Sequence, residues 1–199
     1  MAEKLFQESD YDSEVGYYQV AYAGWMSDMR LRKEASSAGF VTGILQFLFD
    51  AGEIEGAVVT RAKPEYPMQS EVYIARTKDE LEASKGSKYC PTPTGAAFKE
   101  IRESAGRYAF VGLPCHIHGL RKAQQELTFL KEKIVISISL FCGGLTTFRG
   151  GDFVLDKFKI AKNDIQSFQY RGGGLPDGIK VRFKSQAQDV FIPSKSYYS

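Results

Sequence analysis

The sequence predicts an α/β fold with a largely parallel or mixed sheet flanked by helices, and with an antiparallel addition near the C-terminus. Short apolar runs alternate with helical patterns between residues 36 and 160, as in proteins with mostly parallel sheets. Lys133–Phe141 is a nearly continuous apolar run, which is typical of a central parallel strand. Three strand-like segments follow near the C-terminus, at Asp164–Tyr170, Ile179–Phe183 and Asp189–Ile192.

The first half of the chain begins with a polar segment, residues 1–13, which we expect to be a flexible arm. Glu14–Met26 is rich in Tyr, Val and Ala and is interpreted as a strand or strand pair. Phe40–Ala51 carries apolar residues at helical spacing, and Ser36 or Ser37 is its expected N-cap. Two strands and a helical turn are expected next, at Ile54–Arg61, Glu71–Arg76 and Asp79–Ala83.

The second half alternates helices and strands. Helices are expected at Thr94–Ser104, His116–Glu126 and Asp152–Phe158, and a further strand at Tyr108–Val111. We therefore divide the chain into the arm, an α/β region at residues 14–160 and the start of a C-terminal β region at residues 161–199. No closing helix or polar tail follows the last strand, so we expect a truncated protein.

The composition excludes several classes of protein. The chain has 199 residues with 26 Lys and Arg against 24 Asp and Glu, a balance that argues against a nucleic-acid-binding protein. No apolar run approaches the roughly 20 residues that span a bilayer, and no signal peptide is visible, so we expect a cytoplasmic protein without a membrane span. Three cysteines are too few for a disulfide framework and indicate metal binding, catalysis or simple burial.

Two cysteines follow predicted strands. Cys115 lies in a Gly-x-Pro-Cys turn between a strand and a helix, where the helix N-terminus favours a thiolate. Cys142 follows the next apolar strand, so both thiols reach one sheet edge if these strands are parallel neighbours. The alternative is two buried small hydrophobic residues. A cubane iron–sulfur cluster usually needs about four thiolates, and Cys90 lies in a separate loop.

The turn that contains Cys115 also allows functions other than binding a cluster. Cys115 with His116 or His118 would suit a zinc- or thiol-dependent hydrolase, although residues 116 and 118 point in different directions on a helix. A non-catalytic docking subunit is the third possibility.

Three loops have the composition of ligand-binding segments. Ser36–Gly39 precedes a helix and is either an anion seat or a plain N-cap, without a GxGxxG or Walker A pattern. Gly86–Tyr89 combines a hydroxyl, a cation and an aromatic ring, which can grip a phosphate and stack on a ring system; the alternative is a solvated lysine. Tyr170–Pro176 is glycine-rich, and its Arg171 suits a carboxylate or phosphate unless the loop is only a hairpin connection.

Read in order, these stretches resemble the family formed by the beta subunits of coenzyme F420 hydrogenases and dehydrogenases. Five short segments between about residues 36 and 178 carry the resemblance: Ser36–Thr42, Gly86–Tyr89, Phe110–Cys115 with Leu120–Lys122, Leu140–Cys142 and Tyr170–Pro176. Singly each segment is weak, but five in the same order are fairly specific.

The resemblance implies an oxidoreductase subunit with FAD and a 4Fe-4S iron–sulfur cluster. Such a subunit passes electrons between a deazaflavin, coenzyme F420, or a similar carrier and a hydrogenase, formate dehydrogenase, ferredoxin or reductase module. Cys115 and Cys142 would be cluster ligands, with the remaining ligands outside this chain. The flavin site would be formed by Ser37, Ala38, Gly39, Thr42, Ser87, Lys88, Tyr89, Gly112, Pro114 and Arg171.

The chain departs from the family pattern in two respects. Ala38 stands where the family usually has a second glycine. The downstream Cys-x-x-Cys and the ferredoxin-like N-terminal segment of many members are also absent from this sequence.

Overall fold

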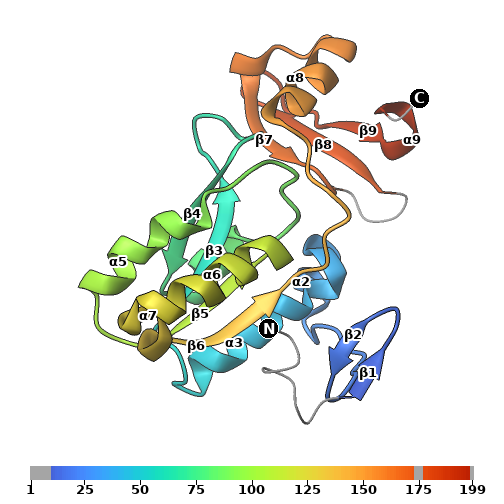
Figure 1. Cartoon of the computed structure of the whole chain (residues 1–199). Helices are drawn as coiled ribbons and strands as arrows, with labels where there is room; N and C mark the ends of the chain where they lie inside the picture. Colours follow the sequence, from blue (N-terminus) through green and yellow to red (C-terminus); the bar gives the residue numbers. More distant parts are fainter. Residues whose placement is uncertain (1–9, 173–176, 198–199) are drawn as a thin grey trace.

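A four-stranded mixed sheet forms the centre of the protein (Figure 1). The computed structural model describes residues 10–172 and 177–197. The strand order is β4-β3-β5-β6, with bounds Ser70–Ala75, Gly56–Ala62, Tyr108–Gly112 and Ile134–Ser139. Strands β3, β5 and β6 run parallel, and β4 is an antiparallel edge strand, which confirms the predicted mixed sheet.

Strands β5 and β6 end level with each other. Their pairing reaches from Tyr108 opposite Ile134 to Gly112 opposite Ser139, with one register shift after Tyr108. The Leu140 N–H continues the ladder by donating to the Gly112 carbonyl at 2.9 Å. The two loops that carry Cys115 and Cys142 therefore start at the same edge of the sheet.

Helices cover both faces of this sheet. Leu45 of α3 (Phe40–Asp50) and Leu81 of α4 (Lys78–Ala83) pack with Ala57, Val59 and Ala109. On the other face, Ile101, Leu120 and Leu130 of α5 (Phe98–Glu103), α6 (Pro114–Glu126) and α7 (Thr128–Lys133) pack against Val58, Tyr108 and Phe110. Successive strand residues point to opposite faces, so one apolar run supplies both cores. Burial of each large side chain contributes roughly 1.5–3 kcal/mol.

A second, antiparallel sheet lies near the C-terminus (Figure 1). Its order is β7-β8-β9, with bounds Ile165–Gln169, Gly178–Phe183 and Val190–Pro193, and the short helix α9, Ser194–Tyr197, follows it. Helix α8, Phe148–Lys157, packs on it through Val154 and Leu155. This confirms the predicted antiparallel addition.

The N-terminal part differs most from the prediction. β1, Asp10–Asp12, pairs with β2, Gly16–Tyr18, so a hairpin begins within the segment expected to be an arm, whose residues 1–9 lie outside the described residues. Within Glu14–Met26 only β2 is a strand. Helix α2, Met29–Glu34, is not predicted by the sequence pattern because it is mostly polar. Its N-cap is Asp28, which accepts from the N–H groups of residues 30 and 31.

Two other helical segments also differ. Helix α7 occupies Thr128–Lys133, where the sequence predicts a connection and the start of a strand. The expected helix at residues 94–104 is a 3-10 turn, Thr94–Ala97, followed by α5. Another short 3-10 turn, Lys162–Asp164, precedes β7. Within the described ranges, no helix is both long and apolar enough to cross a bilayer.

Candidate functional site

The Gly-x-Pro-Cys turn sits at the carboxyl edge of the central sheet. Gly112 is the last residue of β5, and a Cβ there would lie 2.8 Å from the Cβ of His116, so the close packing of turn and helix requires glycine. Pro114 is the first residue of α6, where its missing N–H costs nothing. Cys115 follows it and is exposed.

His116 serves the turn itself. Its Nδ1 accepts the Leu113 N–H at 3.3 Å, which satisfies a donor at the start of α6. Burial lowers the pKa of His116 and so favours the neutral ring that this acceptor role requires. The ring nitrogen nearest the turn is thus occupied, which removes support for His116 as the base of a hydrolase.

Cys142 lies three residues beyond β6 and is exposed. β5 and β6 are parallel neighbours, so the segments that carry Cys115 and Cys142 leave the same edge of the sheet. Among the described residues, however, no group of three or more Cys, His, Asp or Glu side chains is placed to hold a metal. The third cysteine, Cys90, is buried, and its Sγ lies 3.1 Å from Ser70 Oγ.

The segment before α3 has a backbone that the sequence does not predict. Ser37, Ala38 and Gly39 have φ values of 49°, 54° and 71°, three consecutive left-handed residues. Gly39 takes the N-cap position without a side-chain hydrogen bond, so the prediction of Ser36 or Ser37 as N-cap was wrong. The chain must reverse here to enter α3, and left-handed residues make that reversal possible. Thr42, in the first turn of α3, is buried.

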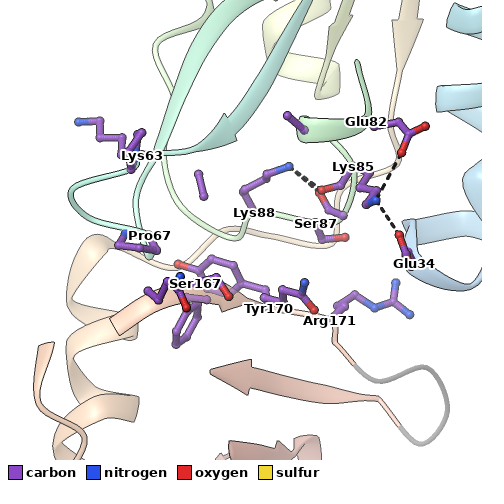
Figure 2. Close-up of a pocket in the computed structure, with 17 residues that line it drawn as sticks. Glu34, Lys63, Pro67, Glu82, Lys85, Ser87, Lys88, Ser167, Tyr170 and Arg171 are labelled. Atoms are coloured by element: carbon purple, nitrogen blue, oxygen red, sulfur yellow. Dashed lines mark hydrogen bonds and ion pairs between the residues drawn. The ribbon is translucent and has the colours of Figure 1, made fainter. Parts of the chain in front are cut away.

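A hydroxyl pair joins this segment to the second predicted loop. Ser36 Oγ lies 2.8 Å from Ser87 Oγ, although the two residues are 51 positions apart. The next residue, Lys88, points back toward its own turn (Figure 2). Its Nζ donates to the carbonyls of Ser84, Lys85 and Gly86, the latter two at 2.9 and 3.0 Å. Burial lowers the pKa of Lys88 to about 8.

Tyr89 links the same loop to the C-terminal sheet. Its ring meets that of Tyr170 edge-on, with centroids 5.7 Å apart. Its carbonyl accepts from Thr146 Oγ1 at 2.7 Å, in the segment that follows Cys142. The Tyr170 hydroxyl donates to the Met68 carbonyl at 2.6 Å, and the Arg171 Nε bonds Asp177 Oδ2 at 2.7 Å. Residues 173–176 of the predicted glycine-rich loop lie outside the described residues.

A cavity of about 430 Å³ is lined by two of these loops, through Ser87, Lys88, Tyr170 and Arg171, while residues 36–42 and Tyr89 are not part of its lining (Figure 2). It opens beyond the carboxyl end of β3, which is where ligands of open α/β sheets usually bind. The side chains around it come from the end of β3 and the turn after it, from the end of α4 with the loop that follows, from β7 with the two residues after it, and from the end of α2. Its charged lining consists of the cations Lys63, Lys85, Lys88 and Arg171 and the anions Glu34 and Glu82.

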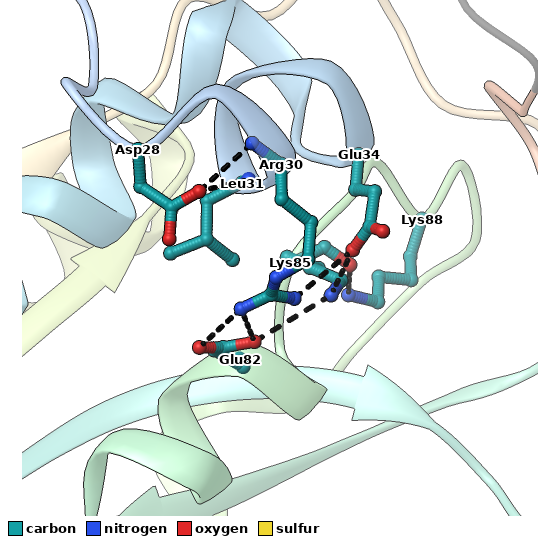
Figure 3. A network of polar contacts seen from close by, with 7 residues as sticks. All are labelled: Asp28, Arg30, Leu31, Glu34, Glu82, Lys85 and Lys88. Atoms are coloured by element: carbon teal, nitrogen blue, oxygen red, sulfur yellow. Dashed lines mark hydrogen bonds and ion pairs between the residues drawn. The ribbon is translucent and has the colours of Figure 1, made fainter.

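An ion-pair network forms one wall of the cavity (Figure 3). Arg30 of α2 contacts both carboxylate oxygens of Glu82 of α4, at 3.1 and 3.0 Å. Lys85 contacts Glu34 at 2.6 Å and Glu82 at 3.8 Å. The network ties α2 to α4. Sequence patterns do not reveal it, because charged residues on exposed helices do not indicate which partner they contact.

Family models match nearly the whole chain. The model described as coenzyme F420 hydrogenase/dehydrogenase, beta subunit N-term, matches residues 21–99. The model for the C terminus of the beta subunit of the same proteins matches residues 105–195. The chain belongs to this family. The resemblance seen in the five sequence segments is therefore confirmed.

Relatives of this chain include proteins of Methanothermobacter thermautotrophicus and Methanosarcina mazei. The coenzyme F420 hydrogenase subunit beta of Methanothermobacter thermautotrophicus is 33% identical over 133 residues, which cover 64% of this chain and 47% of that protein. An F(420)H(2) dehydrogenase subunit of Methanosarcina mazei is 34% identical over 145 residues, 70% of this chain and 39% of that protein. The chain thus spans less than half the length of these two relatives.

A solved structure supports the fold. A chain of the F420-reducing NiFe hydrogenase complex from Methanosarcina barkeri superposes with a TM-score of 0.66 and 19% identity. The match covers 87% of this chain and 60% of the solved one.

Proposed function

We propose that this beta-subunit chain belongs to a cytoplasmic oxidoreductase and passes electrons between a deazaflavin carrier and a partner redox module. Its relatives include a coenzyme F420 hydrogenase subunit beta and a coenzyme F420-dependent sulfite reductase, which supports F420 as the carrier. The partner would be a hydrogenase, formate dehydrogenase, ferredoxin or reductase module. Phe141, next to Cys142, is 97% exposed, and a partner surface would cover it.

The single observation that carries the proposal is that three loops meet, two of which line the cavity. The Ser36–Ser87 hydroxyl pair and the Tyr89–Tyr170 ring contact bring together three segments that the family resemblance selects from distant parts of the chain. A binding site needs residues from several segments held in one place, and these contacts provide that arrangement.

We assign a flavin, FAD, to this region. When bound, FAD would accept a hydride and release single electrons, chemistry that belongs to the cofactor. Successive N–H groups in turn conformations can bind an anion, and residues 37–39 have such a backbone. The proposed site consists of residues that would contact the flavin or hold the loops that contact it: Ser37, Ala38, Gly39, Thr42, Ser87, Lys88, Tyr89, Gly112, Pro114 and Arg171. The chain's part is to bind and orient the ring system and to limit the access of water to it.

The iron–sulfur cluster fits the described residues only in part. Cys115 and Cys142 begin from neighbouring strand ends and would supply two thiolates. A 4Fe-4S cluster usually needs about four, and the described residues place no third ligand beside them. We therefore propose these two cysteines as ligands and derive no electron-transfer step through the cluster.

A flavin titration tests the proposal. The purified chain should quench the fluorescence of added FAD with a saturable isotherm. Replacing Ser87 by Ala removes the hydroxyl pair with Ser36 and should weaken binding about tenfold, equivalent to about 1.4 kcal/mol. Ser185→Ala is the matched control. It also removes one hydroxyl hydrogen bond, to Asp164, but Ser185 follows β8 of the C-terminal sheet and does not line the cavity.

The outcomes are distinct. Absence of FAD binding by the wild-type chain would contradict the assignment of the cofactor. Equal weakening by the two serine variants would show that the cavity region is not the binding site.

A further inference from the structure

We propose that Lys88 is a positioning residue: its ammonium group closes the turn at residues 84–88 and so sets the shape of the candidate site without touching the ligand. The inference rests on the proposed function for the identity of the ligand. It gives Lys88 a different role from the phosphate grip suggested by its composition and place in the loop.

The ammonium group of Lys88 is fully occupied by hydrogen bonds within its own turn. A lysine ammonium has three N–H donors, and here three backbone carbonyls accept them, those of Ser84, Lys85 and Gly86. Ser84 is the C-cap of α4, where carbonyls lack partners within the helix. A cation at this end also interacts favourably with the helix dipole. No N–H of the Lys88 ammonium is left for a phosphate in this arrangement.

The residues on either side of Lys88 make two of the contacts that join the site loops. Ser87 on one side pairs with Ser36 at 2.8 Å, and Tyr89 on the other side meets the ring of Tyr170 at 5.7 Å. Fixing the side chain of residue 88 onto the turn fixes the backbone from which both contacts project. One clamp therefore sets two of the contacts that join the site loops.

The turn itself would be loose without this clamp. Gly86 has a φ of +82°, and a Cβ placed there would meet no atom within 4 Å. Glycine in open space has wide conformational freedom. Two amides in the turn are protected by hydrogen bonds, from Ser84 to the Leu81 carbonyl and from Lys85 to the Glu82 carbonyl. They report directly on whether the turn stays closed.

The first test uses backbone amide hydrogen exchange in the flavin-free chain. Lys88→Met should raise the exchange rate in residues 82–90 at least tenfold and leave α6 unchanged. Lys63→Met is the matched control, since Lys63 lines the same cavity but its ammonium donates to a side-chain oxygen, that of Gln69, and to no backbone carbonyl among the described residues. Unchanged exchange in Lys88→Met would overturn the proposal, whether or not the chain binds flavin.

The second test compares FAD with riboflavin, which lacks phosphate. If Lys88 is a positioning residue, Lys88→Met should weaken the binding of FAD and of riboflavin by the same factor, within about twofold. Lys88→Arg should restore part of the lost affinity. Weakening confined to FAD would show that Lys88 grips phosphate and would overturn the proposal. If Lys88→Met fails to fold, Lys88→Gln takes its place. Failure of the wild type to bind either flavin would contradict the proposed function, while the exchange result would still decide the role of Lys88.

Discussion

Backbone strain is concentrated at two adjacent residues beside the candidate site, Ser37 and Ala38. Ala38 has a φ of 54°, and a side chain other than hydrogen makes this conformation costly by roughly 1–2 kcal/mol. Glycine, which has no Cβ, adopts this conformation freely. The alanine therefore lowers the stability of the folded chain at this point.

Ala38→Gly should stabilise the protein. Relief of the left-handed strain exceeds the extra entropy that glycine gives the unfolded chain, so we expect a gain of about 0.5–1 kcal/mol in the free energy of unfolding by urea. Ala51→Gly is the control, because Ala51 has a φ of −76° and no strain to relieve. A loss of stability in Ala38→Gly would show that the alanine methyl group contributes packing.

A carboxylate on the C-terminal sheet makes a pH-dependent contribution. Asp189 bonds Arg182 at 3.1 Å and Lys180 at 2.9 Å, and these two cations lower its pKa from 3.8 to about 2. A lowered pKa in the folded state means that the stabilisation is complete above about pH 4 and is lost as the pH falls toward 2.

Replacement of Asp189 by Asn should therefore remove part of the pH dependence. The urea midpoints of the variant and the wild type should differ at pH 5 and converge as the pH approaches 2. Asp10→Asn, on the exposed β1 hairpin, is the control and should not reproduce this convergence. A constant difference between variant and wild type across the range would contradict the ion-pair origin of the shift.

At the scale of elements, ion pairs rather than a large apolar contact hold α2 beside α4. Leu31 is the one buried residue of this six-residue helix. Arg30 and Glu34 reach across to Glu82 and Lys85 (Figure 3). Since Glu34, Glu82 and Lys85 also line the cavity, the network couples the position of α2 to the wall of the site.

Glu82→Gln should lower stability by about 0.5–1 kcal/mol at low salt, because Arg30 and Lys85 lose a shared carboxylate. The difference in stability should shrink in about 1 M NaCl, where the Debye screening length is about 3 Å. Glu103→Gln is the control, since its pair with Arg102 is exposed and 3.9 Å long. A salt-independent loss in Glu82→Gln would indicate lost packing instead.

At the scale of the whole molecule, one tyrosine joins the two sheets. Tyr170 follows β7, its ring contacts Phe168 and Tyr89, and its hydroxyl donates to the Met68 carbonyl before β4. Burial raises the pKa of Tyr170, which keeps the hydroxyl protonated as a donor. The cavity lies at this junction, so the link helps to define the site (Figure 2).

Tyr170→Phe should destabilise the chain by about 1–2 kcal/mol, because the Met68 carbonyl loses its donor. Thermal unfolding measures the effect, and Tyr22→Phe is the control because Tyr22 is 85% exposed. Equal midpoints for Tyr170→Phe and the wild type would show that water replaces the hydroxyl at the junction.

Prediction from the sequence succeeded where the signal was local. Helix α3 and strands β5 and β6 were located within a few residues because apolar periodicity reports directly on one element. Helices α2 and α7 were missed because each is six residues long and buries a single side chain, so neither shows a periodic pattern. The N-cap of α3 was missed because three left-handed residues carry no pattern in the sequence.

By itself, the sequence determined the fold class, the order of most elements, the two cysteines at strand ends and the family. Each of these features depends on short segments whose composition restricts the backbone conformation or the possible chemistry. Only the tertiary structure decided that Ser36 meets Ser87, that Lys88 turns back onto its own turn and that Cys90 is buried while the other two thiols are exposed. The physical reason is that such contacts depend on strand order, register and the path of the loops, which the composition of a short segment does not encode.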